Sequence, residues 1–520
     1  MTDVKELYLQ GFELLKEKNY DAALEFVENM KRLAPENKTA YLLEIQIFNA
    51  KKDYLRLIPA IQKILPYMKL TSSAEISFVS DLLDTLAHAQ LKFAMSDDAL
   101  KNFQLAARMS QNANNALIRY GASIFCSGRV SKFSVTDSRI LYAALRKYLA
   151  DIKPYPRQFY AHDKIRVGFL SGDFRKHSAM KWSWSLLTRL DKNRFNVYCY
   201  SSNKHSDKIT DYLREHVDTW RDICDLTDEQ AAELIHEDEI DILIDLSGHT
   251  SGNRLRVAAY HPAAVQISGV GYTNSTGLDA MDYFLTDVHC AGNPDYFTEK
   301  LLILPHSHIC YAAPLEVAIA APPCLAKGYV TFGSFNNFDK MTDEVLTVWK
   351  KILDAVPNSR LIIKNGLINN NDGRDFVVKR LKKFGFDAEQ FELRGYTIDY
   401  LSEYGDVDIG LDTFPFTGGI TTCDALWMGV PVVSLYGDRH GTRIGLSILA
   451  NVGLEGFATD SLDRYVELAV ALAGDKDLLS LLRTNLRGMM SRSPLMDSAG
   501  YIRDVEAVFV KILSPVSAVR

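Results

Sequence analysis

The chain has 520 residues, of which 47% are hydrophobic and 24% are charged. This length predicts about three or four domains, and the hydrophobic fraction is sufficient for large buried cores. The net charge of -6 at pH 7 argues against a general nucleic-acid-binding protein, because such a protein would be basic.

The sequence shows no pattern of a secretory signal, a membrane span or a paired-cysteine motif. The first residues do not form a secretory signal, and no apolar run reaches the length of a membrane span. The seven cysteines are scattered without C-x-x-C spacing, which indicates reduced thiols and no zinc site. We therefore expect a cytoplasmic protein without a membrane span.

The first part of the chain has helical periodicity and a weak repeat. Gly11, Ala23 and Pro35 stand where the tetratricopeptide pattern places its small residues and its closing proline. We predict a tetratricopeptide-like domain over 1–127 and a helical linker over 128–162. Stacked helix pairs form a concave surface that binds peptides or proteins. The alternative is a helical domain that only supports the rest of the chain.

From residue 163 the pattern changes to strands that alternate with helices, which predicts parallel sheets covered on both faces. We expect one Rossmann-like domain over 163–318, a second over 325–500 and a C-terminal helix over 501–520. Two such domains facing each other form the GT-B architecture of glycosyltransferases. The expected strands are 164–171, 196–200, 240–246, 265–269, 283–286, 301–304, 329–335, 360–364, 391–395, the start of 408–431, and 432–435.

Residues 408–431 combine an apolar strand, a glycine turn and the start of a helix. Glycines let backbone amides approach a ligand closely, and a helix N-terminus attracts anions. The stretch therefore predicts a diphosphate site, with Asp424 placed to accept a hydrogen bond from a ribose hydroxyl. An ordinary strand–helix–strand unit is the alternative. The glycine and hydroxyl residues of the predicted site are Gly418, Gly419, Thr421 and Thr422.

Other candidate residues follow predicted strand ends, where ligands of parallel sheets bind. His177 and His249 come after strands of the first domain, and Lys340 follows the first strand of the second domain. Asp406 and Asp408 form a D-x-D sequence, which is the metal signature of a different glycosyltransferase fold. Because this sequence leads into an apolar strand, we interpret it as incidental.

Six motifs, in order, resemble the O-linked N-acetylglucosamine transferase family, which includes the Spindly-type protein O-fucosyltransferases. The resemblance covers roughly residues 164–513. The motifs are S-G-D-F-R-K-H-S (171–178), D-L-S-G-H-T-S-G-N-R (245–254), H-P-A-A-V-Q-I-S-G-V-G-Y-T-N-S-T-G (261–277), F-G-S-F-N-N-F-D-K (332–340), L-D-T-F-P-F-T-G-G-I-T-T-C-D-A-L-W-M-G-V-P (411–431) and G-D-R-H-G-T-R-I-G (437–445).

This resemblance implies an inverting, metal-independent enzyme that transfers a sugar from a nucleotide donor to Ser or Thr of a protein. It implies that Lys340 stabilises the leaving diphosphate. It also places His177 in the sugar and acceptor pocket, where the imidazole takes the acceptor proton or positions the sugar. No cofactor is expected beyond the donor. The implied nucleotide-sugar site consists of Asn337, Lys340, Gly395, Thr397, Tyr400, Gly418, Gly419, Thr421, Thr422 and Asp424.

Departures from the family pattern leave the donor open. Animal-type members carry His at the position of Gly419 and Thr at that of Ile420, and His is frequent at the position of Tyr400. We expect UDP-N-acetylglucosamine, with GDP-fucose and then UDP-glucose as alternatives.

A tetratricopeptide adaptor with an inactive transferase domain is the non-enzyme alternative. A protein or peptide acceptor is expected along the N-terminal repeats, and a homo-oligomer is compatible with the sequence.

Overall fold

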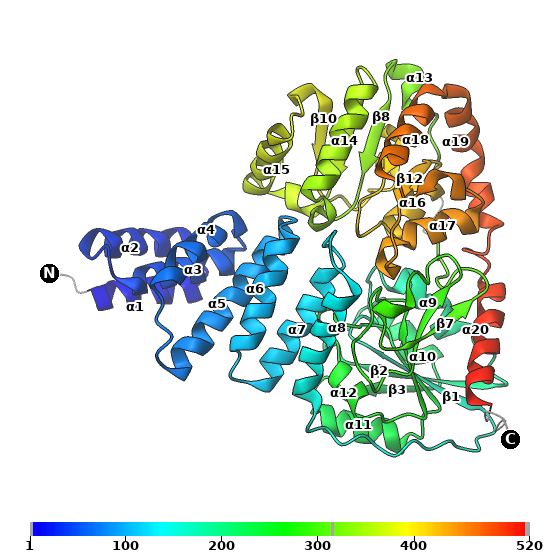
Figure 1. Ribbon diagram of the computed structural model, residues 1–520, viewed down its shortest axis with the longest axis horizontal. Helices are drawn as coiled ribbons and strands as arrows, with labels where there is room; N and C mark the ends of the chain where they lie inside the picture. The colour runs from blue at the N-terminus through cyan, green and yellow to red at the C-terminus, as the bar shows by residue number, and fades with distance from the viewer. Residues whose placement is uncertain (1–3, 314–316, 515–520) are drawn as a thin grey trace.

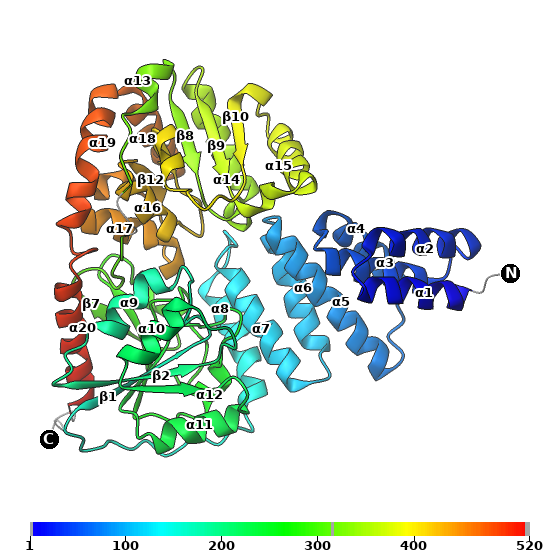
Figure 2. The same ribbon diagram turned by 180° about the vertical axis from the view of Figure 1, so that it is seen from behind.

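The computed structural model describes residues 4–313 and 317–514. Parts of the expected N-terminus, interdomain connection and C-terminal helix, at 1–3, 314–316 and 515–520, lie outside the described residues. Figures 1 and 2 show a helical arm that extends sideways from two α/β bodies, which lie one above the other. The arm meets the α/β bodies through its later helices.

The arm is built from consecutive antiparallel helices. Small residues permit their close approach: Ala23 is fully buried, and a Cβ at Gly11 would lie 2.9 Å from Leu43 Cδ2. This confirms the predicted helical N-terminal region. The helices are α1 (Val4–Lys16), α2 (Tyr20–Leu33), α3 (Lys38–Lys51), α4 (Tyr54–Ile64), α5 (Ser73–Lys92), α6 (Ser96–Met109), α7 (Ala113–Ser127) and α8 (Val135–Arg146).

The first α/β body has a seven-stranded sheet whose pairings are all parallel, in the order β3-β2-β1-β4-β5-β6-β7. Helices cover its faces (Figure 1), so the central strand β4 is buried along its whole length and has an apolar run without alternation. The strands are β1 (Ile165–Ser171), β2 (Phe195–Ser201), β3 (Thr219–Asp222), β4 (Ile242–Asp245), β5 (Val265–Gly269), β6 (Tyr283–Asp287) and β7 (Lys300–Leu304); the helices are α9 (Met180–Thr188), α10 (Lys208–His216), α11 (Asp228–Glu237) and α12 (Leu255–Ala259).

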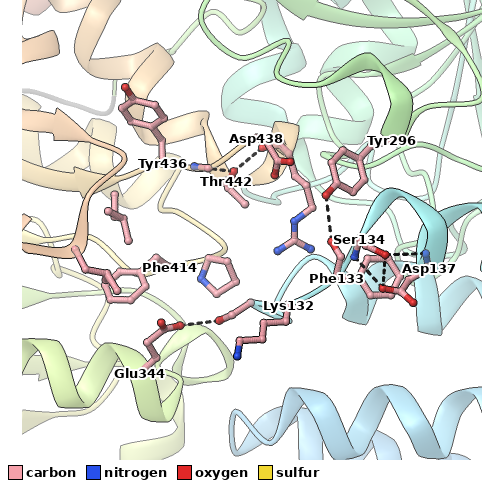
Figure 3. A pocket seen from close by; sticks show the side chains of 16 residues that line it. Lys132, Phe133, Ser134, Asp137, Tyr296, Glu344, Phe414, Tyr436, Asp438 and Thr442 are labelled. Atoms are coloured by element: carbon pink, nitrogen blue, oxygen red, sulfur yellow. Dashed lines mark hydrogen bonds between the residues drawn. The ribbon is translucent and has the colours of Figure 1, made fainter.

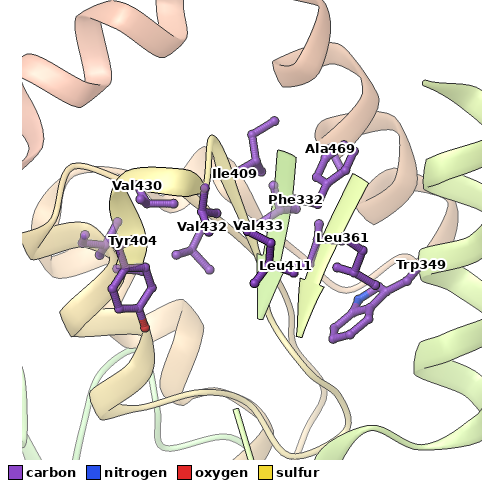
Figure 4. Close-up of a cluster of buried hydrophobic side chains, with 14 of the residues drawn as sticks. Phe332, Trp349, Leu361, Tyr404, Ile409, Leu411, Val430, Val432, Val433 and Ala469 are labelled. Carbon is purple, nitrogen blue, oxygen red and sulfur yellow. The ribbon is translucent and has the colours of Figure 1, made fainter. Parts of the chain in front are cut away.

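The second body repeats this plan with a six-stranded parallel sheet, in the order β10-β9-β8-β11-β12-β13. Its core gathers apolar side chains from strands and covering helices around Phe332 and Trp349, which are fully buried (Figure 4). The strands are β8 (Thr331–Ser334), β9 (Arg360–Lys364), β10 (Phe391–Arg394), β11 (Ile409–Leu411), β12 (Val432–Leu435) and β13 (Ala458–Thr459); the helices are α13 (Pro323–Lys327), α14 (Asp343–Ala355), α15 (Asn371–Lys383), α16 (Ile420–Trp427), α17 (Ile444–Val452), α18 (Leu462–Gly474) and α19 (Lys476–Ser491).

Helix α20 (Ser498–Leu513) leaves the second body and packs beside the first sheet (Figure 1). Its side chains Tyr501, Val505 and Phe509 belong to the core of the first body. Glu506 accepts hydrogen bonds from the Asp191 amide at 2.8 Å and from Arg194 at 3.1 Å. The chain therefore ties its two α/β bodies together at the end of the sequence.

The pair of parallel sheets with covering helices confirms the predicted α/β, GT-B-type fold. Two short strands were not predicted: β3 and β13, of four and two residues. Their few residues give little periodicity to detect. Tyr400 lies in a turn before the short 3₁₀ helix η7 (Ser402–Asp406).

Candidate active site

The strand order of the second sheet locates its ligand site. The order reverses between β8 and β11, which start the two halves of the sheet, and ligands of open parallel sheets bind beyond the carboxyl ends of strands at this point. The segment after β8 contains Asn336 and the short 3₁₀ helix η4 (Phe338–Lys340). The segment after β11 leads through the glycine turn into α16. The two predicted segments therefore meet at one edge of the sheet.

Lys340 is held at this edge by contacts from both segments. Its Nζ donates to the Thr417 carbonyl at 2.9 Å and to Asn336 Oδ1 at 3.5 Å, and it lies 4.5 Å from the centre of the Phe416 ring. Burial lowers the pKa of the Lys340 ammonium to about 8. Asn336 also accepts from Thr421 Oγ1 at 3.0 Å, so it links the lysine to the start of α16.

The glycine turn is set by close packing. The Gly418 amide donates to Asp412 Oδ1 at 2.6 Å, and a Cβ at Gly418 would lie 2.4 Å from Thr422 Oγ1. A Cβ at Gly419 would lie 2.5 Å from the ring of Trp182, which comes from the first body. Trp182 thus fills the space that a larger residue at position 419 would need. The first N–H groups of α16 have no acceptors within the helix, which suits an anion.

Asp424 is buried and already holds three partners. Tyr400 donates to its Oδ2 at 2.6 Å, Lys181 donates to its Oδ1 at 3.1 Å, and Tyr311 also donates to Oδ1. Burial, followed by the Asp424 charge, raises the pKa of both tyrosines. Lys181 lies on α9 of the first body, so the ion pair crosses between the two bodies. A ribose hydroxyl would have to join or replace one of these donors.

The segment after β10 carries the remaining nucleotide-side residues. Lys364 Nζ donates to the Gly395 carbonyl at 2.5 Å and to Thr397 Oγ1 at 2.9 Å, and it pairs with Glu403 at 2.7 Å. Next to these fixed residues, Tyr396 and Ile398 are 68% and 89% exposed. An exposed ring and an exposed aliphatic chain at the end of a strand offer apolar surface to a nucleobase.

His177 lies on the segment between β1 and α9, beyond the switch point of the first sheet. Its Nδ1 accepts from the Ala179 amide at 3.3 Å and lies 3.5 Å from Asp173 Oδ2. The ring is 40% exposed. The same segment leads into Lys181 and Trp182, both of which contact the donor-side residues described above.

Two of the sequence candidates have structural roles in their surroundings. His249 is half-buried, its Nε2 donates to the Thr276 carbonyl at 2.7 Å, and burial of the ring lowers its pKa to about 4. A Cβ at Gly121 of the arm would lie 2.6 Å from its Nδ1. Asp408 of the D-x-D sequence accepts from the amides of Cys324 and Thr331 at 3.0 Å and 2.8 Å. Both carboxylate oxygens of Asp408 are therefore engaged by backbone amides of the second body.

A cavity of about 560 Å³ lies between the arm and the second body (Figure 3). Ser131, Lys132 and Phe133 line it from the segment that joins α7 and α8, and Phe414 and Asp438 line it from the second body. Ser131 Oγ donates to Glu344 at 2.8 Å, which closes one side. The arm therefore reaches the same FPFTGG segment that holds Lys340.

The structure places Lys340, Thr421, Gly418, Gly419 and Asp424 at one sheet edge. Asn337 is exposed on the same segment, next to the buried Asn336, which the sequence analysis did not select. Motif matching alone could not choose between two adjacent asparagines. Lys181, Trp182 and Tyr311 were not among the sequence candidates. Lys181 and Trp182 reach the site from α9 of the first body, and Tyr311 reaches it from the segment that connects the two bodies.

Comparisons with known proteins agree with this geometry. The model of glycosyl transferase family 41 matches residues 147–312 and 317–505. The chain belongs to this family. A tomato (Solanum lycopersicum) relative is described as a probable UDP-N-acetylglucosamine–peptide N-acetylglucosaminyltransferase SPINDLY; it is 39% identical over 393 residues, which are 72% of this chain and 42% of the relative. The SEC relative of Arabidopsis thaliana, described as a probable enzyme of the same activity, is 27% identical over 67% of this chain and 37% of its own length.

A solved structure extends the likeness to the arm. A mutant of the Thermobaculum terrenum O-GlcNAc transferase matches with a TM-score of 0.81 and 26% identity, covering 98% of this chain and 97% of the other. The predicted membership of the O-linked N-acetylglucosamine transferase/Spindly family is confirmed. The chain spans less than half the length of the two plant relatives.

Proposed function

We propose that this family 41 member is an inverting, metal-independent protein O-glycosyltransferase. The observation that carries the proposal is a buried lysine at the sheet switch point, next to a glycine turn and a helix N-terminus. Together these supply fixed positive charge where a donor diphosphate would bind. A divalent metal is then unnecessary for the leaving group.

In the proposed reaction the acceptor hydroxyl attacks the anomeric carbon while the bond to the diphosphate breaks on the opposite face. Lys340 and the first amides of α16 stabilise the charge that grows on the leaving diphosphate. His177 receives the hydroxyl proton or positions the sugar. Its Nδ1 accepts from the Ala179 amide, so the neutral ring carries its proton on Nε2, which can donate to a sugar hydroxyl. Taking the acceptor proton at Nε2 requires the other tautomer, in which Nδ1 no longer accepts from this amide.

For the donor we propose UDP-N-acetylglucosamine, with GDP-fucose as the second candidate and UDP-glucose as the third. The descriptions of the plant relatives and of the Thermobaculum structure support N-acetylglucosamine. Trp182 against Gly419, and Tyr400 in the turn, replace side chains of animal-type members. These replacements are the reason to retain the other two donors.

For the acceptor we propose a protein or peptide that approaches along the arm and through the cavity of Figure 3, where arm and donor body both contribute walls. None of the described helices is long and apolar enough to span a membrane. None of the seven cysteines, all within the described residues, forms a disulfide, which supports our proposal of a cytoplasmic location. A homo-oligomer also remains a prediction.

The proposal is tested by incubating the purified protein with each of the three donors and measuring nucleotide release, with EDTA and without added metal. We expect one donor to be hydrolysed slowly, and faster hydrolysis or labelling when the acceptor is present. If no nucleotide sugar binds or turns over, the adaptor alternative is correct. Turnover that EDTA abolishes and manganese restores would contradict metal independence.

A further inference from the structure

A cluster of metal-ligand side chains lies where the two α/β bodies meet. Cys290 follows β6 and His308 follows β7 of the first body, whereas His440 begins the short 3₁₀ helix η8 (His440–Thr442) of the second. All three residues are at most 2% exposed. One ligand atom from each lies within 4.8 Å of the other two. The cluster is separate from the contacts of Lys340 and Asp424 described above.

Hydrogen bonds fix both imidazoles with one nitrogen turned away from the cluster. His308 Nδ1 lies 2.5 Å from Asp287 Oδ2, and His440 Nδ1 lies 3.2 Å from the Thr273 carbonyl. A carbonyl only accepts, so His440 Nδ1 carries the proton and its Nε2 has a lone pair. Metal-binding histidines usually donate their second nitrogen to a carboxylate or a carbonyl in this way.

The His440 Nε2 is the second observation that points to a ligand. It is buried and, among the described residues, has no hydrogen-bond partner. A buried acceptor without a partner is destabilising, so an occupant that takes its lone pair would remove this cost. His308 and Cys290 each place one ligand atom within 4.8 Å of a ligand atom of His440.

The local charge also fits a cation. Asp287 is fully buried and accepts from the amides of His289, Cys290 and His308 and from Ser447 Oγ at 2.7 Å. Among the described residues, its one ion-pair partner is His308. A divalent cation bound by a Cys290 thiolate would be neutralised by that thiolate and the Asp287 carboxylate together.

We propose that Cys290 Sγ, His308 Nε2 and His440 Nε2 bind a zinc ion that joins the two α/β bodies, with a water as the fourth ligand. Binding releases the thiol proton of Cys290 to solvent. With the usual Zn–S and Zn–N bond lengths, the ligand atoms of such a tetrahedral site lie about 3.3–3.6 Å apart, so zinc binding would draw the three atoms closer together than they are here. The sequence spacing hides this site, since its ligands do not form a short cysteine motif.

The test is the metal content of the full-length protein, purified through a tag without histidines and without chelators, by mass spectrometry. We expect close to one zinc ion per chain. Cys290→Ser and His440→Asn should lose most of it. Cys126→Ser is the matched control, because Cys126 is also buried with its Sγ 3.4 Å from a backbone carbonyl, as Cys290 is; it should keep the zinc.

Cobalt substitution tests the ligands of the wild-type protein even if a variant fails to fold. Protein produced with cobalt in place of zinc should show a thiolate-to-cobalt charge-transfer band that Cys126→Ser retains. The proposal is overturned if the wild-type protein holds no zinc both as purified and after refolding with zinc chloride. It is also overturned if folded Cys290→Ser and His440→Asn proteins retain the metal, or if bound cobalt shows no thiolate band.

Discussion

Lys340 is a buried lysine that holds its proton less tightly than an exposed one, although the ammonium still predominates at pH 7. Burial lowers its pKa to about 8, while the nearby Asp339 and Asp412 charges raise it again in part. A bound diphosphate would add negative charge beside the ammonium and raise this pKa. The Lys340 ammonium is therefore stabilised by negative charge that appears during the reaction, and a neutral ligand would not stabilise it in this way.

We predict that Lys340→Met lowers turnover by about two to three orders of magnitude, the usual effect of removing one group that stabilises a developing charge. Donor affinity should fall much less, because the charge on the diphosphate grows mainly in the transition state. Calorimetry of donor binding and a nucleotide-release assay on the same protein separate the two effects. Normal turnover in this variant would rule out the leaving-group role.

The same pKa predicts the alkaline limb of the pH profile. Below about pH 8 the free enzyme carries the Lys340 ammonium, and above it the amine is neutral. The value of kcat/KM should therefore fall as pH rises through about 8, approaching tenfold per pH unit. Bound donor raises the pKa, so kcat should fall at higher pH than kcat/KM. A kcat/KM that stays level to pH 10 contradicts the assignment.

Asp424 gives a further prediction at this scale. Asp424→Ala removes the acceptor shared by Tyr311, Tyr400 and Lys181, and it leaves Lys181 without its partner across the two bodies. We expect nucleotide affinity to fall at least tenfold by calorimetry, since a charge-assisted hydrogen bond is worth about 1.5–3 kcal/mol. Unchanged affinity in a variant with the wild-type melting temperature would remove Asp424 from the nucleotide site.

At the scale of elements, the segment between α7 and α8 connects the arm to the donor site. Arg129 Nε donates to Asp339 Oδ2 at 2.7 Å, and its guanidinium lies 4.7 Å from the centre of the Phe416 ring. Lys340 also lies over this ring. Arg439 of the second body in turn donates to the carbonyls of Ser127 and Val130. The arm thus supports the segments that hold the lysine.

We predict that Arg129→Met lowers kcat by roughly ten- to a hundredfold with a small change in donor Kd, because a small displacement of a reacting group is enough for such a loss. Arg129 also lowers the pKa of Lys340, so its removal should raise that pKa. The fall of kcat/KM should therefore shift to higher pH. Arg139→Met is the matched control: Arg139 pairs with Asp295 on the surface, with both side chains 65% exposed. An unchanged kcat and pH profile in Arg129→Met would leave the segment without a positioning role.

What the sequence could and could not predict follows from the distance between interacting residues along the chain. The β11–turn–α16 unit and the segment after β8 are local, so spacing and residue type indicated them. Lys181 and Asp424, which are 243 residues apart, meet only when the two bodies pack. The same holds for Trp182 against Gly419 and for His440 beside His308. No periodicity within one element encodes such pairs.

At the scale of the whole molecule, the arm is not a separable unit throughout its length. Its later helices share a core with the first body: Phe103, Tyr120 and Leu141 pack in one cluster with Leu255 and Met281. The first helices form a different cluster of their own around Val27 and Leu43. Deleting 1–127 would open the shared core, whereas deleting 1–36 removes α1 and α2, opens the outer cluster and uncovers only the part of the next cluster where Leu24 packs.

We therefore predict that the protein without residues 1–36 folds and releases nucleotide from the donor at the wild-type rate, yet labels its protein acceptor several-fold more slowly. The donor contacts lie far along the chain from α1 and α2, whereas an acceptor that follows the concave arm loses part of its contact surface. Labelling of a short peptide should change less than labelling of the intact acceptor, because a short peptide reaches only the cavity near Phe414. Labelling of the intact acceptor at the full rate would show that the outer arm does not bind it.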